Sequence, residues 1–170
     1  RTSNASLGIA IAMGARKEIY KQSKRVRQNY SKLIQDSLIW VEKEKKIQQK
    51  EYIQYFFGED VIPENIIGTI TSILIFENIQ GIDTSKPIFG LAKRKDEDIY
   101  KVSGRAHEKI VKQGVNLSEA IREACILLNL DVLGGGHPPA AGVKIPIDMV
   151  ENFLESCNLV IQNQLRYIRS

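Results

Sequence analysis

The sequence has two cysteines, two histidines and one tryptophan among 170 residues, and these scarcities exclude several classes of site. Cys125 and Cys157 lie far apart and lack metal-ligand spacing, so neither a zinc site nor a disulfide framework is expected. The carboxylates are scattered, and neither a Walker loop nor a Ser-His-Asp arrangement occurs. The chain therefore does not hold a complete hydrolytic site, and its free cysteines suit a reducing, cytoplasmic compartment.

Long hydrophobic runs are also absent. The longest apolar-rich stretch, residues 66–76, is interrupted by glycine, threonine and serine, so no membrane span is expected. The N-terminus lacks the basic segment and apolar core of a signal peptide. With 43% apolar and 26% charged residues, the composition is that of a globular domain. The first residue is Arg rather than Met, which suggests a fragment.

Positive charge is concentrated at the N-terminal end. Residues 1–50 carry 12 Lys and Arg against 4 Asp and Glu, a net charge of +8, whereas residues 51–170 carry 12 against 16, a net charge of −4. The densest basic patch consists of Arg16, Lys17, Lys21, Lys24, Arg25 and Arg27. Such a patch can contact phosphates or an acidic partner, or it can be a solvated helix face.

Hydrophobic periodicity predicts an α/β fold. Apolar residues at spacings of three, four and seven predict one long helix over residues 15–49. Residues 68–76 are rich in β-branched side chains and predict a strand, and residues 87–94 and 99–106 predict an antiparallel pair with its tip at 95–98. An amphipathic helix over 118–128, capped by Asn116 or Ser118, a short strand at 143–146 and a helix over 149–168 complete the chain. We expect a mixed β-sheet with flanking helices, preceded by a long N-terminal linker helix.

The segment KVSGR, residues 101–105, is the first candidate binding element. Strand alternation puts Lys101, Ser103 and Arg105 on one face and Val102 on the other. An ammonium, a hydroxyl and a guanidinium together can bind a phosphate or a nucleobase, since arginine forks onto phosphate oxygens. The alternative is an exposed polar strand face.

The stretch GGGHPPAAG, residues 134–142, is the second candidate. Gly134, Gly135 and Gly136 permit positive φ and leave their amide groups unshielded, which suits an anion pocket. His137 follows the bare loop, where its ring can donate a hydrogen bond to a phosphate oxygen. The alternative is a glycine-rich turn with a structural histidine.

Residues 101–146 resemble the DHH-associated domain, the C-terminal domain of DHH phosphoesterases. GGGHPPAAG resembles the signature of that domain, and VSGRA followed by GVNLSEAIREA resembles its upstream motif. NASLGIAIAMG, GTITSIL and KPIFGLA are similar to segments of archaeal RecJ-like proteins. The resemblance implies that Ser103 and Arg105 contact substrate phosphate or base, and that residues 134–137 touch the phosphate near the scissile bond.

The resemblance also implies a missing partner domain. A DHH domain with two divalent metal ions, manganese or magnesium, would hydrolyse the phosphodiester, and its metal-binding motifs are absent from this sequence. We therefore expect residues 1–57 to be the linker helix and the end of a DHH domain, and residues 58–170 to be the DHH-associated domain.

Three functions remain open from the sequence. The first is binding of single-stranded DNA or RNA as the substrate-holding part of a RecJ-like exonuclease. The second is a non-catalytic replisome scaffold that joins GINS and MCM, in which the basic helix meets an acidic protein surface. The third is a DHH oligoribonuclease or cyclic-dinucleotide phosphodiesterase, which the long linker helix makes less favourable.

Overall fold

The computed structural model describes residues 17–77, 79–94, 97–132 and 134–167, together with residues 9 and 12. Of residues 17, 18 and 167 it describes the backbone alone. The strands are β1 (Gln48–Gln49), β2 (Gln54–Phe57), β3 (Ile88–Lys93), β4 (Ile99–Arg105), β5 (Gly135–His137) and β6 (Ala140–Pro146). The helices are α2 (Lys17–Lys43), α3 (Ile67–Phe76), α4 (Glu108–Val111), α5 (Leu117–Leu127) and α6 (Val150–Tyr167), with a 3-10 turn, η1 (Ile147–Met149).

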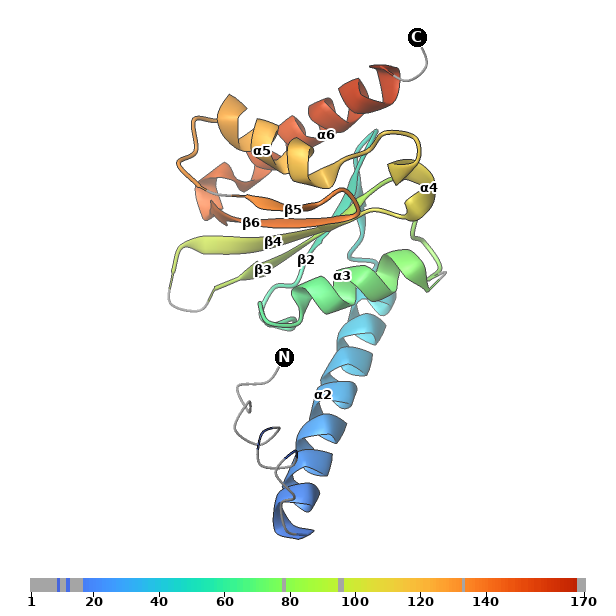
Figure 1. Ribbon diagram of the computed structural model, residues 1–170, viewed down its shortest axis with the longest axis vertical. Coiled ribbons are helices and arrows are strands. Elements are labelled where there is room, and N and C mark those ends of the chain that lie inside the picture. Colours follow the sequence, from blue (N-terminus) through green and yellow to red (C-terminus); the bar gives the residue numbers. More distant parts are fainter. Residues whose placement is uncertain are drawn as a thin grey trace.

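One mixed sheet, in the order β1-β2-β3-β4-β6-β5, forms the middle layer of the molecule. Figure 1 shows α5 and α6 on one face of this sheet and α3 on the other, with α2 projecting away from α3. The predicted α/β class, with a mixed sheet, flanking helices and a long N-terminal helix, is confirmed. No helix in the described ranges has the length and apolarity that crossing a membrane requires.

Helix α2 is shorter at its C-terminal end than predicted. It ends at Lys43, and Lys45 follows with a φ of 48°, a left-handed conformation that turns the chain out of the helix. Residues 48–49 then form β1, which pairs antiparallel with β2. Periodicity alone extends the predicted helix too far, because residues 44–47 contain neither Gly nor Pro to mark the end.

The prediction of a strand over residues 68–76 is wrong, because this segment forms α3. Its buried residues recur at the helical spacings of three and four and pack against the sheet and α2: Ile67, Ile70, Thr71, Leu74 and Ile75. Ile73 and Phe76, which lie outside this buried face, are also apolar, so the sequence shows only a weak helical period. Two side-chain hydroxyl groups donate hydrogen bonds to backbone carbonyls of the same helix. Thr71 Oγ1 donates to the Ile67 carbonyl at 2.7 Å, and Ser72 Oγ donates to the Gly68 carbonyl at 2.8 Å.

Strand β2 was not predicted, and it explains why α3 is a helix. β2 pairs in parallel with β3, with Gln54 opposite Ile88 and Phe57 opposite Leu91. Adjacent parallel strands need a crossover connection, and α3 is the helix within this one. β1 and β2 lie before residue 58, where the second predicted domain begins, yet they belong to the same sheet as β3.

The antiparallel pair of β3 and β4 is confirmed, with Ile88 opposite Arg105 and Lys93 opposite Tyr100. The predicted tip includes residues 95 and 96, which lie outside the described residues. β4 also pairs along its whole length with β6, from Ile99 opposite Pro146 to Arg105 opposite Ala140. β4 is therefore held on both sides.

Two hydrophobic cores lie on opposite faces of the sheet. The larger packs α5 and α6 onto residues such as Phe89, Val102 and Val143. The smaller packs α3 and the end of α2 onto Phe56 and Ile88, which belong to β2 and β3. Each fully buried phenylalanine contributes about 1.5–3 kcal/mol. The smaller core contains no residue of β4, β5 or β6, although α3 also lies beside β4, where Ser72 contacts Arg105.

The predicted helix over 118–128 is confirmed as α5, and the Asn116 side chain accepts hydrogen bonds from the Ser118 and Glu119 amides at its start. The final helix begins one residue later than predicted, and residue 168 lies outside the described residues. Cys125 and Cys157 are free and buried, and burial raises the pKa of both thiols.

We predict that Gly90→Ala destabilises the fold by about 1–3 kcal/mol, because the added methyl group overpacks the contact between α3 and β3. A Cβ at Gly90 would overlap with Thr71 Oγ1 and lie 2.9 Å from Phe56 Cζ. Urea denaturation followed by circular dichroism measures the change. Gly135→Ala is the matched control, because no atom lies within 4 Å of its added Cβ. An unchanged midpoint for Gly90→Ala would contradict direct packing of α3 on β3.

Candidate functional site

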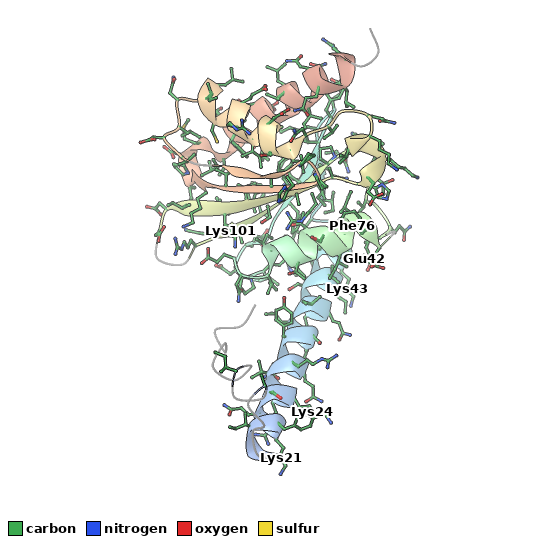
Figure 2. The ribbon with its side chains drawn as sticks, viewed as in Figure 1. Lys21, Lys24, Glu42, Lys43, Phe76 and Lys101 are labelled. Atoms are coloured by element: carbon green, nitrogen blue, oxygen red, sulfur yellow. The ribbon has the colours of Figure 1, made fainter. Side chains whose placement is uncertain are left out.

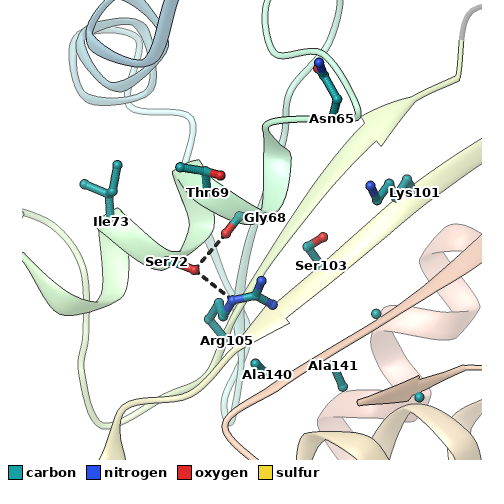
Figure 3. Close-up of a pocket in the computed structure, with 12 residues that line it drawn as sticks. Asn65, Gly68, Thr69, Ser72, Ile73, Lys101, Ser103, Arg105, Ala140 and Ala141 are labelled. Atoms are coloured by element: carbon teal, nitrogen blue, oxygen red, sulfur yellow. Dashed lines mark hydrogen bonds between the residues drawn. The ribbon is translucent and has the colours of Figure 1, made fainter. Parts of the chain in front are cut away.

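A cleft of about 730 Å³ lies between α3 and the neighbouring face of β4, β5 and β6. Figure 3 shows α3 as one wall and strands β4 and β6 as the opposite side. The lining residues are Asn65, Gly68, Thr69, Ser72 and Ile73 from the α3 side, Lys101, Ser103 and Arg105 from β4, and Gly135, Ala140, Ala141 and Gly142 from β5 and β6.

The three predicted polar residues of β4 do share one face, and that face lines the cleft. Lys101, Ser103 and Arg105 are two residues apart, so their side chains repeat at about 7 Å along the strand. Val102 points to the opposite face and is buried in the larger core. The β6 residues paired with Ser103 and Arg105 are Gly142 and Ala140, which leave space above the strand.

Arg105 is the most constrained side chain of the cleft. Its Nε donates to Ser72 Oγ at 2.8 Å and its Nη1 to the Gly104 carbonyl at 2.7 Å, so α3 and β4 together hold the guanidinium (Figure 3). Burial lowers the pKa of Arg105, and arginine still stays charged at neutral pH. No ion pair between described residues includes Arg105. A half-buried cation without a carboxylate is an electrostatic site for an anion.

Two further groups extend the positive potential along β4. Lys101 Nζ donates to the Glu64 carbonyl at 3.0 Å, and Lys144 on β6 stands directly opposite Lys101. Like charges directly opposite one another in a sheet are destabilising, and an anion between them would relieve the repulsion. Ser103 is buried, and its hydroxyl takes part in no hydrogen bond between described residues.

The glycine stretch is not the open loop that was predicted. Residues 135–137 form β5, Pro138 and Pro139 form a turn, and the chain returns as β6. Only Gly135 of the three glycines lines the cleft. A Cβ at Gly134 would lie 2.5 Å from Ile121 Cγ2, so this glycine allows α5 to approach the sheet.

Gly136 and His137 complete this hairpin. Gly136 has a φ of 152°, and a Cβ added there would lie 2.9 Å from the Cβ of Ala141. His137 is exposed and pairs with Ala140, which itself pairs with Arg105. Paired residues of neighbouring strands share a face, so the register puts His137 on the cleft side of the sheet, at its rim. His137 does not contribute to the lining of the cleft.

Sequence reasoning missed the contribution of α3. Ser72 anchors Arg105, and a Cβ at Gly68 would lie 3.1 Å from Arg105 Nη2 and 3.4 Å from Ser103 Oγ. The spacing of Gly68 and Ser72 by four residues was the available signal, since both then lie on one face of a helix. That signal is lost once the segment is interpreted as a strand.

The predicted basic patch lies elsewhere, on the part of α2 that projects from the domain. Lys21, Lys24, Arg25 and Arg27 are all exposed, and Figure 2 shows Lys21 and Lys24 near the free end of the helix. Arg16 lies outside the described residues, as does the side chain of Lys17. None of the residues that line the cleft comes from α2.

The side chains that line the cleft are of kinds that bind anions. No histidine, cysteine or carboxylate is among the described residues that line it. No cluster of three or more His, Cys, Asp or Glu side chains that could hold a metal occurs in the described ranges. What the cleft offers is two cations, several hydroxyls and small residues, a set that binds phosphate-like anions.

Comparisons of structure place this fold among known ones. RecJ of Thermus thermophilus in complex with Mn²⁺ aligns with 86% of this chain and 18% of its own, with a TM-score of 0.50 and 18% identity. The pGpG-specific phosphodiesterase PggH of Vibrio cholerae aligns with 96% of this chain and 53% of its own, with a TM-score of 0.50 and 13% identity. At these identities the likeness concerns the fold alone.

Comparisons of sequence give the family. The uncharacterized protein MJ0831 of Methanocaldococcus jannaschii is 32% identical over 121 residues, which are 71% of this chain. The chain spans about a quarter of the length of that relative, 24%. Residues 44–163 match the DHHA1 domain, a region that runs from the end of α2 into α6 and contains the whole cleft. The chain therefore belongs to the DHHA1 domain family, as its glycine–histidine motif and VSGRA segment indicate.

Proposed function

We propose that the chain holds a strand of single-stranded DNA or RNA in the cleft, as the substrate-binding part of a RecJ-like DHH exonuclease. The observation that carries this proposal is the state of Arg105, which is half-buried, anchored by Ser72 and free of any carboxylate partner among the described residues. Its Nη2 faces the space beside Gly68, where a phosphate oxygen can reach it.

The arrangement of the polar groups favours a strand over a compact ligand. The lining of the cleft follows β4, along which Lys101, Ser103 and Arg105 repeat at about 7 Å. Such a row matches successive phosphates of an extended backbone, and it is independent of base sequence. Phosphate contacts of this kind give binding that weakens as salt concentration rises.

Cleavage of the strand is assigned to a part of the protein outside this chain. A divalent metal, manganese or magnesium, would be held by a DHH domain, because the described residues offer no cluster of ligands for it. In the complete protein the DHH domain is the partner that faces the cleft.

In the scaffold hypothesis, in which the chain joins GINS and MCM, the partners bind the basic face of α2. The cleft would then have no ligand. The desolvated guanidinium of Arg105 favours a function that uses the cleft, since an unused buried charge would only destabilise the fold.

We predict that Arg105→Ala weakens binding of a labelled oligothymidylate by about 10- to 100-fold, which corresponds to the loss of about 1.5–3 kcal/mol for a charge-assisted hydrogen bond. Fluorescence anisotropy at two salt concentrations measures the change. Arg122→Ala is the matched control, because it removes the same charge from the exposed surface of α5. His137→Ala should have a smaller effect, since His137 lies at the rim. Equal affinities for wild type and Arg105→Ala would refute the proposal.

Gly68→Ala provides a second prediction that separates binding from stability. The added methyl group would crowd Arg105 Nη2 and Ser103 Oγ, so affinity for the oligonucleotide should fall severalfold. Because Gly68 lies in a helix, alanine there should leave stability unchanged or raise it by about 0.5–1 kcal/mol. Anisotropy and urea denaturation are compared on the same samples. Retained affinity would show that the ligand does not occupy the space beside Gly68.

A further inference from the structure

The projecting part of α2 carries cations that are not balanced by acidic residues. Among residues 1–35 the sequence has one acidic residue, Glu18, against Arg1, Arg16, Lys17, Lys21, Lys24, Arg25, Arg27 and Lys32. The described ion pairs of the molecule all lie on the domain, where Lys46, Lys50 and Arg94 contact carboxylates. None of the described ion pairs includes a residue of α2.

Two of these cations, Lys24 and Arg27, share one face of the helix with an exposed aromatic side chain. Tyr20, Lys24, Arg27 and Ser31 follow one another at spacings of three and four residues, which puts them in one row. Tyr20 is 65% exposed, which is unusual for a side chain of its size. Beside this row, a shallow hollow of about 320 Å³ is lined by Lys24, Arg27, Gln28, Ser31, Lys32 and Gln35.

We infer that this face of α2, from Tyr20 to Gln35, is a second nucleic-acid-binding surface that contacts the strand beyond the cleft. The cations contact phosphates, the amide and hydroxyl side chains can bond to sugar or base, and the ring of Tyr20 can stack on a base. An acidic polypeptide would satisfy the cations but would give the exposed Tyr20 ring no base to stack on. This combination therefore favours nucleic acid as the occupant.

The surface lies within reach of the cleft. Tyr30 Oη on α2 lies 3.5 Å from Thr69 Oγ1, and Thr69 lines the cleft. From Tyr30 to Tyr20 the helix rises about 15 Å, at 1.5 Å per residue. The inference rests on the proposed function for the strand's path, but the cationic face can bind nucleic acid whether or not the cleft does.

The test compares two lengths of oligothymidylate, about 6 and about 30 nucleotides, within and beyond the site size of a small single-strand-binding fold. The variant Lys24→Gln/Arg27→Gln/Lys32→Gln removes three exposed charges that make no ion pair among the described residues. Lys112→Gln/Arg122→Gln/Arg166→Gln is the control, with the same charge change at the end of α4 and on α5 and α6. Circular dichroism verifies that both variants fold.

Log affinity falls with log salt concentration, and each phosphate contact adds about 0.7 to the magnitude of that slope. For the long oligonucleotide, the α2 variant should therefore show a slope whose magnitude is smaller by about 2. The control should keep the wild-type slope. For the short oligonucleotide, the α2 variant should bind as the wild type does, whereas Arg105→Ala should not. Tyr20→Ala should weaken binding of the long oligonucleotide severalfold without changing the slope, which is the signature of stacking.

The outcomes separate this inference from the proposed function. A wild-type slope in the α2 variant would overturn the inference and leave the cleft intact. Binding of the long oligonucleotide that depends on α2 but not on Arg105 would support the inference and refute the function proposed for the cleft. Polyglutamate that competes as well as the oligonucleotide, with no effect of Tyr20→Ala, would assign the face to acidic polypeptides and overturn the inference.

Discussion

The pairing of β4 with both of its neighbours is the constraint on which the rest of the structure depends. β4 is bonded to β3 on one side and to β6 on the other, and the register of both pairs is continuous through Ser103 and Arg105. A shift of one residue would turn every side chain of β4 to the opposite face. Val102 would then leave the larger core, and the charged residues would enter it. The register that closes the core is thus the one that orients the binding residues.

The other essential feature is that α3 covers only part of its face of the sheet. α3 packs on β2 and β3 through Phe56, Ile88 and Gly90, and the apolar contact ends where β4 begins. At that border Ser72 meets Arg105. The hydrogen bond satisfies a guanidinium that burial has partly desolvated, and it fixes the direction of the side chain. The cleft therefore begins where the smaller hydrophobic core ends, at the border between β3 and β4.

Most local features were predictable from the sequence, because neighbouring residues determine them. The alternation of KVSGR gave the face of Lys101, Ser103 and Arg105, and the cap at Asn116 gave the start of α5. Features set by distant residues were not predictable. The buried residues of α3 lie on one face, but apolar residues outside that face, Ile73 and Phe76, weaken the helical period in the sequence. Its β-branched residues also favour a strand when only propensity is considered.

The glycine stretch shows the same limit. Three adjacent glycines indicate a loop when they are considered alone, whereas in the structure Gly134 and Gly136 serve close contacts to α5 and β6. Their role depends on Ile121 and Ala141, and no local pattern reveals those neighbours. The roles of Gly68 and Ser72 were hidden for a similar reason, since they act on Arg105 across a gap of more than thirty residues in sequence.

The two cationic regions differ in how they interact with an anion, and this difference bears on how they would act together. Arg105 is fixed and partly desolvated in the folded chain, so an anion gains a pre-oriented partner in a region of low screening. The cations of α2 are exposed, and at physiological salt their field decays over about 8 Å. Their contacts must also order long side chains. A strand held by both would therefore be positioned by the cleft, while α2 would raise the rate of capture and lose its influence first as salt rises.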